Sequence, residues 1–211
     1  MPIVEIKKIS ISRSLVIWNI AESVEQLKCM IVLSPTETIT LESIRSEVKK
    51  KEWLAGRIAA KELLISKGIN FNGLLNNEYG KPILKEGTGE VSLSHSYPYV
   101  VAIHDDAEEV GIDLEQPTPK LKAISRKFLR DVELKSANNN ITKLCVYWSA
   151  KEALYKIHSQ RGLIFKENLW VEPFELHSEG TICGRITVNK VEKKYKLHYS
   201  VNQDYVLVYN L

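Results

Sequence analysis

The stretch CVYWSAKEALYKIH, residues 145–158, predicts the most regular helix of the chain. Its apolar residues recur at helical spacing, and lysine, glutamate, alanine and leucine all favour helix. Glu152 and Lys156 are four positions apart, so their side chains project from one face of that helix. Taken alone, such a pair is typical of a solvated surface and stabilises little. It becomes informative beside GIDLE, residues 111–115.

GIDLE predicts a short strand with two acidic side chains. Asp113 and Glu115 alternate, so both carboxylates face one side, about 7 Å apart along the strand. The ordinary interpretation of an isolated Asp-x-Glu is a solvated strand edge. A third carboxylate, Glu152, comes with Lys151 and Lys156 on the predicted helix. Few carboxylates plus lysines as point charges have the makeup of a magnesium site that still needs phosphate.

The overall composition argues against several classes of protein. The 211 residues carry 29 basic and 26 acidic side chains, a net charge of +3 that is well mixed along the chain. This charge is too weak and diffuse for a nucleic-acid or membrane-surface protein. Three scattered cysteines favour reduced thiols. We see no signal peptide and no apolar run long enough for a membrane span, which predicts a soluble, cytoplasmic protein.

The pattern of apolar residues predicts mixed secondary structure. We expect strands and some helix in residues 1–34, a loop at Ser34 to Glu37 that could cap the next helix, and an exposed turn over residues 76–82. The expected helices are 40–50, 52–66 with Gly68 as its stop, 122–137 and 145–158. The expected strands are 91–96, 99–103, 110–114, 182–188, 194–201 and 205–209. If the first three strands form a meander, His95 lies one strand away from Asp113.

A weak internal echo predicts two similar lobes. Trp53 precedes Lys61 by the same eight positions that separate Trp148 from Lys156, and a glycine is expected to close each helix, Gly68 the first and Gly162 the second. SHSYPYVVA and SVNQDYVLV also match in spacing. We therefore expect an α+β fold made by pseudo-duplication, each lobe a small antiparallel sheet packed with a long helix. The expected lobes are residues 1–105 and 106–211, with the site at their interface.

Taken together, four motifs resemble one enzyme family. GIDLE, WSAKEALYK at residues 148–156, LSHS at residues 93–96 and YGKP at residues 79–82 are similar in order and spacing to the 4′-phosphopantetheinyl transferases. The likeness is greatest to the larger, monomeric, surfactin-synthetase-activating type. It runs from about Trp53 to Gly162.

The resemblance implies a reaction and a metal. Such enzymes move phosphopantetheine from coenzyme A to a serine of an acyl or peptidyl carrier protein and release adenosine 3′,5′-bisphosphate, as holo-[acyl-carrier-protein] synthases do. By position, Asp113, Glu115 and Glu152 would hold Mg²⁺ against the pyrophosphate. Glu152, directly or through water, would be the base, with Asp113 part of the catalytic group. Lys156 would contact the α-phosphate and assist the leaving group.

The resemblance also implies coenzyme A contacts in the first half of the chain. His95, Ser94 and Lys81 would bind the nucleotide, with Gly80 and Pro82 shaping the loop. Arg57 is a further candidate, and Arg45 and Lys49 are candidates for the 3′-phosphate.

Two other functions stay open at this point. One is a binding module of the same fold that holds coenzyme A or a carrier without turnover, and the other is an unrelated Mg²⁺-dependent phosphohydrolase. The expected partners are coenzyme A and an apo carrier protein, with no nucleic acid, no membrane and a monomeric chain. A basic helix with Lys120, Lys122, Arg126, Lys127 and Arg130 is a possible carrier-docking surface. Trp148 can be a core anchor or a wall of the site, and the core is favoured.

Overall fold

The computed structural model describes residues 2–160 and 162–211, and its fold is α+β, as predicted. The chain divides into two compact units, which we call unit 1, ending at Val110, and unit 2, Gly111–Leu211. Each unit has its own antiparallel sheet and its own apolar core. Among the described residues, no helix combines the length and the apolar character needed to cross a membrane.

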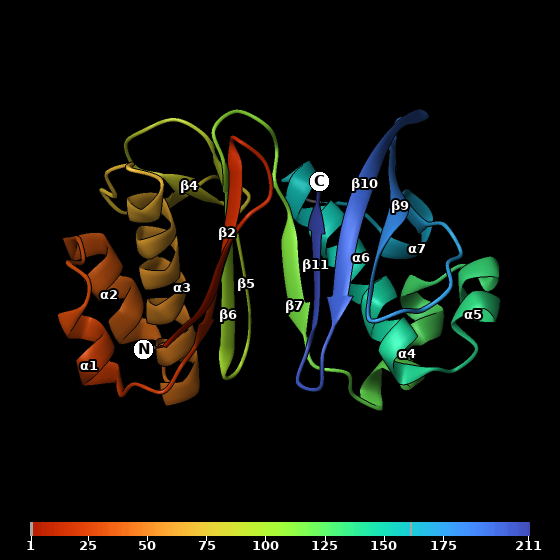
Figure 1. Ribbon diagram of the computed structural model, residues 1–211, viewed down its shortest axis with the longest axis horizontal. Helices are drawn as coiled ribbons and strands as arrows, with labels where there is room; N and C mark the ends of the chain where they lie inside the picture. Colours follow the sequence, from red (N-terminus) through yellow and green to blue (C-terminus); the bar gives the residue numbers. More distant parts are fainter. Residues whose placement is uncertain (1, 161) are drawn as a thin grey trace. The chain divides into compact units, whose positions relative to one another are not determined.

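Unit 1 is a four-stranded sheet with its helices on one side (Figure 1). The strand order is β1-β2-β6-β5, all antiparallel, and a separate hairpin is formed by β3 and β4. The strands are β1 (Ile3–Lys8), β2 (Arg13–Asn19), β3 (Leu74–Asn76), β4 (Pro82–Leu84), β5 (Glu90–Ser96) and β6 (Tyr99–Asp105). The helices are α1 (Val24–Cys29), α2 (Pro35–Ser43) and α3 (Glu47–Ser66).

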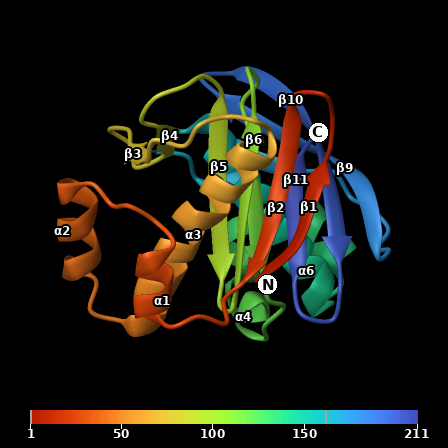
Figure 2. The ribbon, with the colours of Figure 1, turned by 60° about the vertical axis from the view of Figure 1, so that its left-hand side comes forward.

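Helix α3 is the main support of unit 1, and it crosses the face of the sheet (Figure 2). Its buried side includes Leu54, Ile58 and Leu63, all fully buried against β2, β5 and β6. We predicted two helices here, split near residue 51, which is wrong: the Lys-Lys-Lys-Glu run contains no helix breaker, so the helix continues through it. Gly68 ends it as expected, with a positive φ of 75° and its N–H bonded to the carbonyl of Ile65.

Unit 2 is a five-stranded antiparallel sheet in the order β7-β11-β10-β9-β8, covered by α6. The strands are β7 (Ile112–Glu115), β8 (Leu169–Val171), β9 (Glu179–Val188), β10 (Val191–Val201) and β11 (Val206–Asn210). The helices are α4 (Lys120–Phe128), α5 (Asp131–Ala137), α6 (Ile141–His158) and the short α7 (Phe165–Asn168).

Two predictions about the elements around α6 are wrong. The helix expected over residues 122–137 is two helices, because Leu129 is extended and Arg130 starts a new cap, in which Glu133 accepts the Arg130 N–H at 2.7 Å. Helix α6 ends at Ser159 in a left-handed conformation, not at Gly162. Trp148 is a core anchor, as favoured, since its ring packs against Phe128 and Phe165.

The predicted meander of residues 91–114 is also wrong. β5 and β6 do form a hairpin, but β7 pairs with β11 in the sheet of unit 2. The polar segment 106–109 between β6 and β7 forms no hairpin turn, and β11 offers β7 an almost wholly buried partner strand. His95 and Asp113 therefore belong to different sheets.

The internal echo has a structural counterpart. Ser94 pairs with Val101 in the hairpin of β5 and β6, and Ser200 pairs with Leu207 in the hairpin of β10 and β11. In both units a further strand, β2 or β7, pairs with the last strand of the hairpin, and the long helix packs on that last strand. The matched spacing in the sequence thus reports a matched register.

Candidate functional site

The acidic residues of unit 2 lie on two elements that pack tightly together, β7 and α6. A Cβ at Gly111, just before β7, would lie 2.1 Å from the backbone oxygen of Ala153 on α6. Only glycine permits this approach. Farther along, the Sγ of buried Cys145 donates to the backbone oxygen of Glu115 at 3.7 Å. Burial, together with the Glu115 charge, raises the pKa of this thiol, so Cys145 acts as a packing residue.

Lys156 and Asp113 form the centre of this cluster. The Lys156 ammonium donates to the Asp113 carboxylate at 2.8 Å and to the backbone oxygen of Ile112 at 2.8 Å. Asp113 is buried, whereas the Lys156 side chain keeps 24% of its exposure. One cation thus reaches the buried end of the acidic strand from the exposed side of α6.

Glu152 is held in an unusual electrostatic environment. Burial raises its pKa to about 7, the nearby charges of Asp113 and Glu115 add to that rise, and Lys156 opposes it. The Glu152 carboxyl group therefore interacts electrostatically with both β7 carboxylates, as the alternation of Asp113 and Glu115 on one strand face predicts. Its pKa lies where a side chain can exchange a proton at neutral pH.

The three carboxylates fit a hard divalent cation by their chemistry. They place three acidic groups against one ammonium, and the charges of Asp113 and Glu115 add to the rise that burial causes in the pKa of Glu152, a repulsion that a cation would relieve. Oxygen ligands of this kind suit Mg²⁺, which keeps several waters and needs few protein carboxylates. Within the described part of the chain, no three acidic, histidine or cysteine side chains are already arranged around one point.

Lys151 does not belong to this cluster, contrary to the sequence interpretation. It is fully buried, on a different side of α6 from Glu152, and its ammonium donates to Glu133 at 2.9 Å. It also bonds three backbone oxygens, those of Phe128, Leu169 and Phe165. Burial lowers its pKa to about 8, although Glu133 acts in the opposite direction. The Lys151 ammonium makes structural contacts inside unit 2 and is not positioned to bind an anionic ligand.

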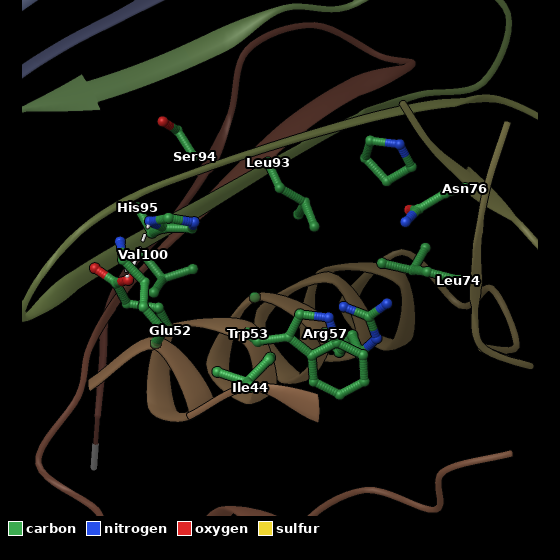
Figure 3. A pocket seen from close by; sticks show the side chains of 13 residues that line it. Ile44, Glu52, Trp53, Arg57, Leu74, Asn76, Leu93, Ser94, His95 and Val100 are labelled. Carbon is green, nitrogen blue, oxygen red and sulfur yellow. Dashed lines mark ion pairs between the residues drawn. The ribbon is translucent and has the colours of Figure 1, made fainter. Parts of the chain in front are cut away.

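Unit 1 contains a separate pocket of about 510 Å³, between α3, β5 and the β3–β4 hairpin (Figure 3). Three of the predicted coenzyme A residues line it: Ser94, His95 and Pro82, with Arg57 as a fourth. The other lining residues are Ile44, Lys49, Glu52, Trp53, Gly56, Leu74, Asn76, Leu93 and Val100. A pocket of this size, lined by apolar and polar side chains together, is typical of a small-molecule site.

One end of this pocket is polar. His95 faces Glu52, with 3.5 Å between its Nδ1 and the Glu52 carboxylate (Figure 3). Glu52 is almost wholly buried, pairs with Lys49 at 2.7 Å and accepts the N–H of Tyr97 at 3.2 Å. The Glu52 carboxylate thus connects the start of α3 with the end of β5, where His95 and Ser94 stand.

Arg57 forms the other polar part of the pocket. Its guanidinium lies 3.4 Å from the ring centroid of Trp53 and donates to Glu37 at 3.0 Å. Glu37 in turn accepts the N–H of Ser34 in the capping box of α2, so the predicted cap is confirmed, whereas the predicted loop over residues 34–37 is wrong because α2 already starts at Pro35. Arg57 is therefore a wall residue that ties α2 to α3.

Lys81 and Gly80 lie beside the β3–β4 hairpin. The Lys81 ammonium pairs with Glu90 at 2.6 Å, and the backbone N–H of Lys81 donates to the side-chain oxygen of Asn77. Gly80 has a φ of 90°, which the turn requires and which favours glycine. Of the two candidates for the 3′-phosphate, Lys49 lines the pocket and Arg45 is exposed at the start of α3.

Two family models match the chain. The model of the 4′-phosphopantetheinyl transferase superfamily covers residues 109–209, and the model of the 4′-phosphopantetheinyl transferase N-terminal domain covers residues 43–104. The chain belongs to the 4′-phosphopantetheinyl transferase superfamily. A comparison with curated proteins found no significant match.

Sequence reasoning missed two contacts in the transferase, one beside the acidic cluster's helix and one in the pocket of unit 1. Glu133 had no motif, and its partnership with Lys151 depends on the break between α4 and α5, which no breaker residue signals. Glu52 follows three lysines in the sequence and carries no motif, and its contact with His95, 43 positions away, has no local signal. In both cases the tertiary fold, not local pattern, brings the partners together.

Proposed function

We propose that this transferase moves 4′-phosphopantetheine from coenzyme A to a serine of an acyl or peptidyl carrier protein, in the presence of Mg²⁺. The single observation that supports this most is the cluster of Asp113, Glu115 and Glu152 against Lys156, in a chain of this superfamily. The length of the chain and the order of its motifs favour the larger, monomeric, surfactin-synthetase-activating type. We also propose that the protein acts in the cytoplasm.

In this proposal Asp113, Glu115 and Glu152 hold the metal. When bound, Mg²⁺ supplies charge neutralisation at the non-bridging oxygens of the pyrophosphate. The remaining work of the chain is to position the reactants and to move one proton. The carboxylates of β7 and α6 concentrate negative charge at this place, which attracts a divalent cation.

Glu152 is the proposed base. A serine hydroxyl must lose its proton as its oxygen attacks phosphorus, and Glu152, directly or through one water, accepts that proton. Lys156, one helical turn away, offsets the charge that develops on the departing phosphate.

The pocket of unit 1 is the proposed site for the nucleotide end of coenzyme A. His95 and Ser94 supply polar contacts at its edge, Pro82 and Arg57 supply walls, and Lys81 with Gly80 shapes the adjoining loop. Replacing His95 by alanine should raise the KM for coenzyme A more than it lowers kcat. An unchanged KM would assign His95 a structural role.

Helix α4 is the proposed docking surface for the acidic helix of a carrier. Lys120, Lys122, Arg126 and Lys127 are exposed on it. Arg130, which we grouped with them, lies outside α4, and its guanidinium is occupied by the backbone oxygens of Lys166 and Glu167. The proposed docking surface therefore consists of the four basic side chains on α4 and does not include Arg130.

Two substitutions test the proposed site directly. Glu152→Gln and Asp113→Ala should each lower the rate of transfer by roughly 100-fold or more, because each substitution removes a proposed metal ligand. Glu152→Gln also removes the proposed base. Glu167→Gln, an exposed carboxylate of the same unit, is the matched control and should keep full activity. Circular dichroism checks that each variant is folded. Folded variants with near-native rates would refute the assignment.

The same assay separates the other two functions. A binding module of the same fold would bind coenzyme A, seen by calorimetry, and leave the carrier unmodified. A phosphohydrolase would release inorganic phosphate from coenzyme A or a phosphomonoester in the absence of any carrier.

A further inference from the structure

Unit 2 has a second hollow, away from the acidic cluster, of about 570 Å³. It lies where α5 ends and α6 begins, beside the segment that follows β8 (α5 and α6 are labelled in Figure 1). The polar side chains that line it are Lys135, Ser136, Asn138, Asn140, Lys143 and Glu175. None of them is a residue of the proposed transfer site.

Lys143 is the unusual member of this group. Only 8% of the residue is exposed, yet its ammonium has no hydrogen bond or ion pair to any residue that the structure describes. Its one recorded partner is the ring of Phe174, whose centroid lies 5.2 Å from Nζ. The stem of Lys143 is thus buried, while its charged head keeps some exposure in the hollow that the residue lines. Lys151, on the same helix, shows the alternative, since its buried ammonium is fully bonded inside the protein.

The surroundings of Lys143 favour a negative ligand. Helix α6 is 18 residues long, and its first turn points positive charge and N–H groups without intrahelical acceptors toward this end. Asn140 caps it by accepting the N–H of Lys143 at 3.0 Å. Lys135 adds a second ammonium at the exposed edge and Ser136 a hydroxyl. Glu175 is the opposing charge, so two cations and the helix end outweigh one carboxylate.

We propose that this hollow binds a small oxyanion, with Lys143 as its main ionic contact. The chemistry fits a phosphate or a carboxylate group, either free or carried by a small molecule, and the volume accommodates more than the bare anion. A bound oxyanion would give Lys143 the hydrogen-bonded partner that the protein does not supply. The site is independent of the proposed transfer reaction.

The test is a titration of the full-length, isotope-labelled chain, followed by amide chemical shifts. Sodium phosphate and sodium acetate are added separately, with sodium chloride at equal ionic strength as the reference. We expect saturable shifts at the amides of residues 136–144 with phosphate, acetate or both. Saturation by phosphate identifies a phosphate ligand, and saturation by acetate alone identifies a carboxylate ligand.

Two variants assign the binding to Lys143. Lys143→Met keeps the shape of the side chain and should weaken the anion roughly tenfold or more, because a charge-assisted hydrogen bond is lost. Lys193→Met is the matched control: Lys193 also lies over a ring, that of Tyr195 at 5.1 Å, but it is exposed and outside the hollow. Lys135→Gln, an exposed change that does not threaten folding, should weaken binding roughly two- to threefold.

Three results would overturn the proposal. They are an absence of saturable shifts with both anions, shifts confined to the surroundings of Asp113 or His95, and equal affinities for the native chain and for Lys143→Met.

Discussion

At the scale of single residues, two lysines on α6 show how one helix serves two purposes. Lys151 is fully buried and bonds Glu133 and three backbone oxygens, whereas Lys156, five positions later, reaches Asp113 and stays partly exposed. Glu133 accepts the N–H groups of Arg130 and Val171 as well. The buried pair thus fixes the ends of α4, α5 and β8 around the helix that carries Glu152.

Removing the Lys151 ammonium should therefore be costly for stability. Lys151→Met leaves Glu133 as an uncompensated buried charge, and we expect a loss of about 3–5 kcal/mol in the free energy of unfolding. Urea unfolding followed by circular dichroism measures it. Lys127→Met, an exposed lysine of α4, should change stability by less than about 0.5 kcal/mol. A loss as small as the control's would show that the pair is not a structural tie.

A second prediction concerns Asp105, at the end of β6. Burial acts to raise its pKa, but the N–H groups of Glu108 and Ala107 and the guanidinium of Arg13, at 2.8 Å, outweigh burial and lower it to about 2. Because the pKa is lower in the folded state, this stabilisation is complete above pH ~4 and is lost as the pH falls toward 2.

The expected size of the Asp105 contribution is about 2 kcal/mol. In Asp105→Asn, the decline in unfolding free energy between pH 5 and pH 2 should shrink by about that amount, measured by urea unfolding across the pH range. An unchanged decline would show that other carboxylates account for the acid sensitivity.

At the scale of elements, the close packing of β7 on α6 brings the acidic groups together. Gly111 makes it possible, since a Cβ there would meet the Ala153 oxygen at 2.1 Å and Ile157 at 2.7 Å. Gly56 on α3 is different, because a Cβ there would make ordinary contacts, 3.7 Å from Leu93. The two glycines form a matched pair.

Alanine at these glycines should have opposite effects. Gly111→Ala must push β7 away from α6, so we expect lower stability by about 1–3 kcal/mol and a loss of transfer activity. Gly56→Ala should stabilise α3 by about 0.5–1 kcal/mol, because glycine in a helix interior costs conformational entropy. Thermal unfolding midpoints of the two variants test this. A neutral Gly111→Ala would mean that the packing is not tight.

The elements also show where sequence reasoning works and where it fails. Helix α6, the hairpin of β5 and β6 and the acidic strand were predictable, because periodicity and alternation are local signals. The break after α4 and the pairing of β7 with β11 were not, since each depends on partners far along the chain, whereas the single α3 was missed although its charged run contains no helix breaker. The proximity of Asp113, Glu152 and Lys156 was expected from the motifs, whereas Glu52, which lines the pocket, and Glu133, the buried partner of Lys151, carry no local signal.

At the scale of the whole molecule, the two units repeat one plan: a strand, a long helix and a hairpin with the same register. The repetition does not extend to chemistry. Unit 1 has an apolar-walled pocket edged by His95 and Glu52, and unit 2 has the acidic cluster with Lys156. We therefore expect variants of the two units to fail differently, in coenzyme A affinity for unit 1 and in turnover for unit 2.

The most direct measurement is the intact mass of an apo carrier protein after incubation with this chain, coenzyme A and Mg²⁺. We predict that the carrier gains one phosphopantetheine with the native chain, and that it gains none when Glu152→Gln replaces the native chain or when EDTA removes the metal. An unmodified carrier, tested across acyl and peptidyl carriers with a folded native chain, would contradict the proposed function.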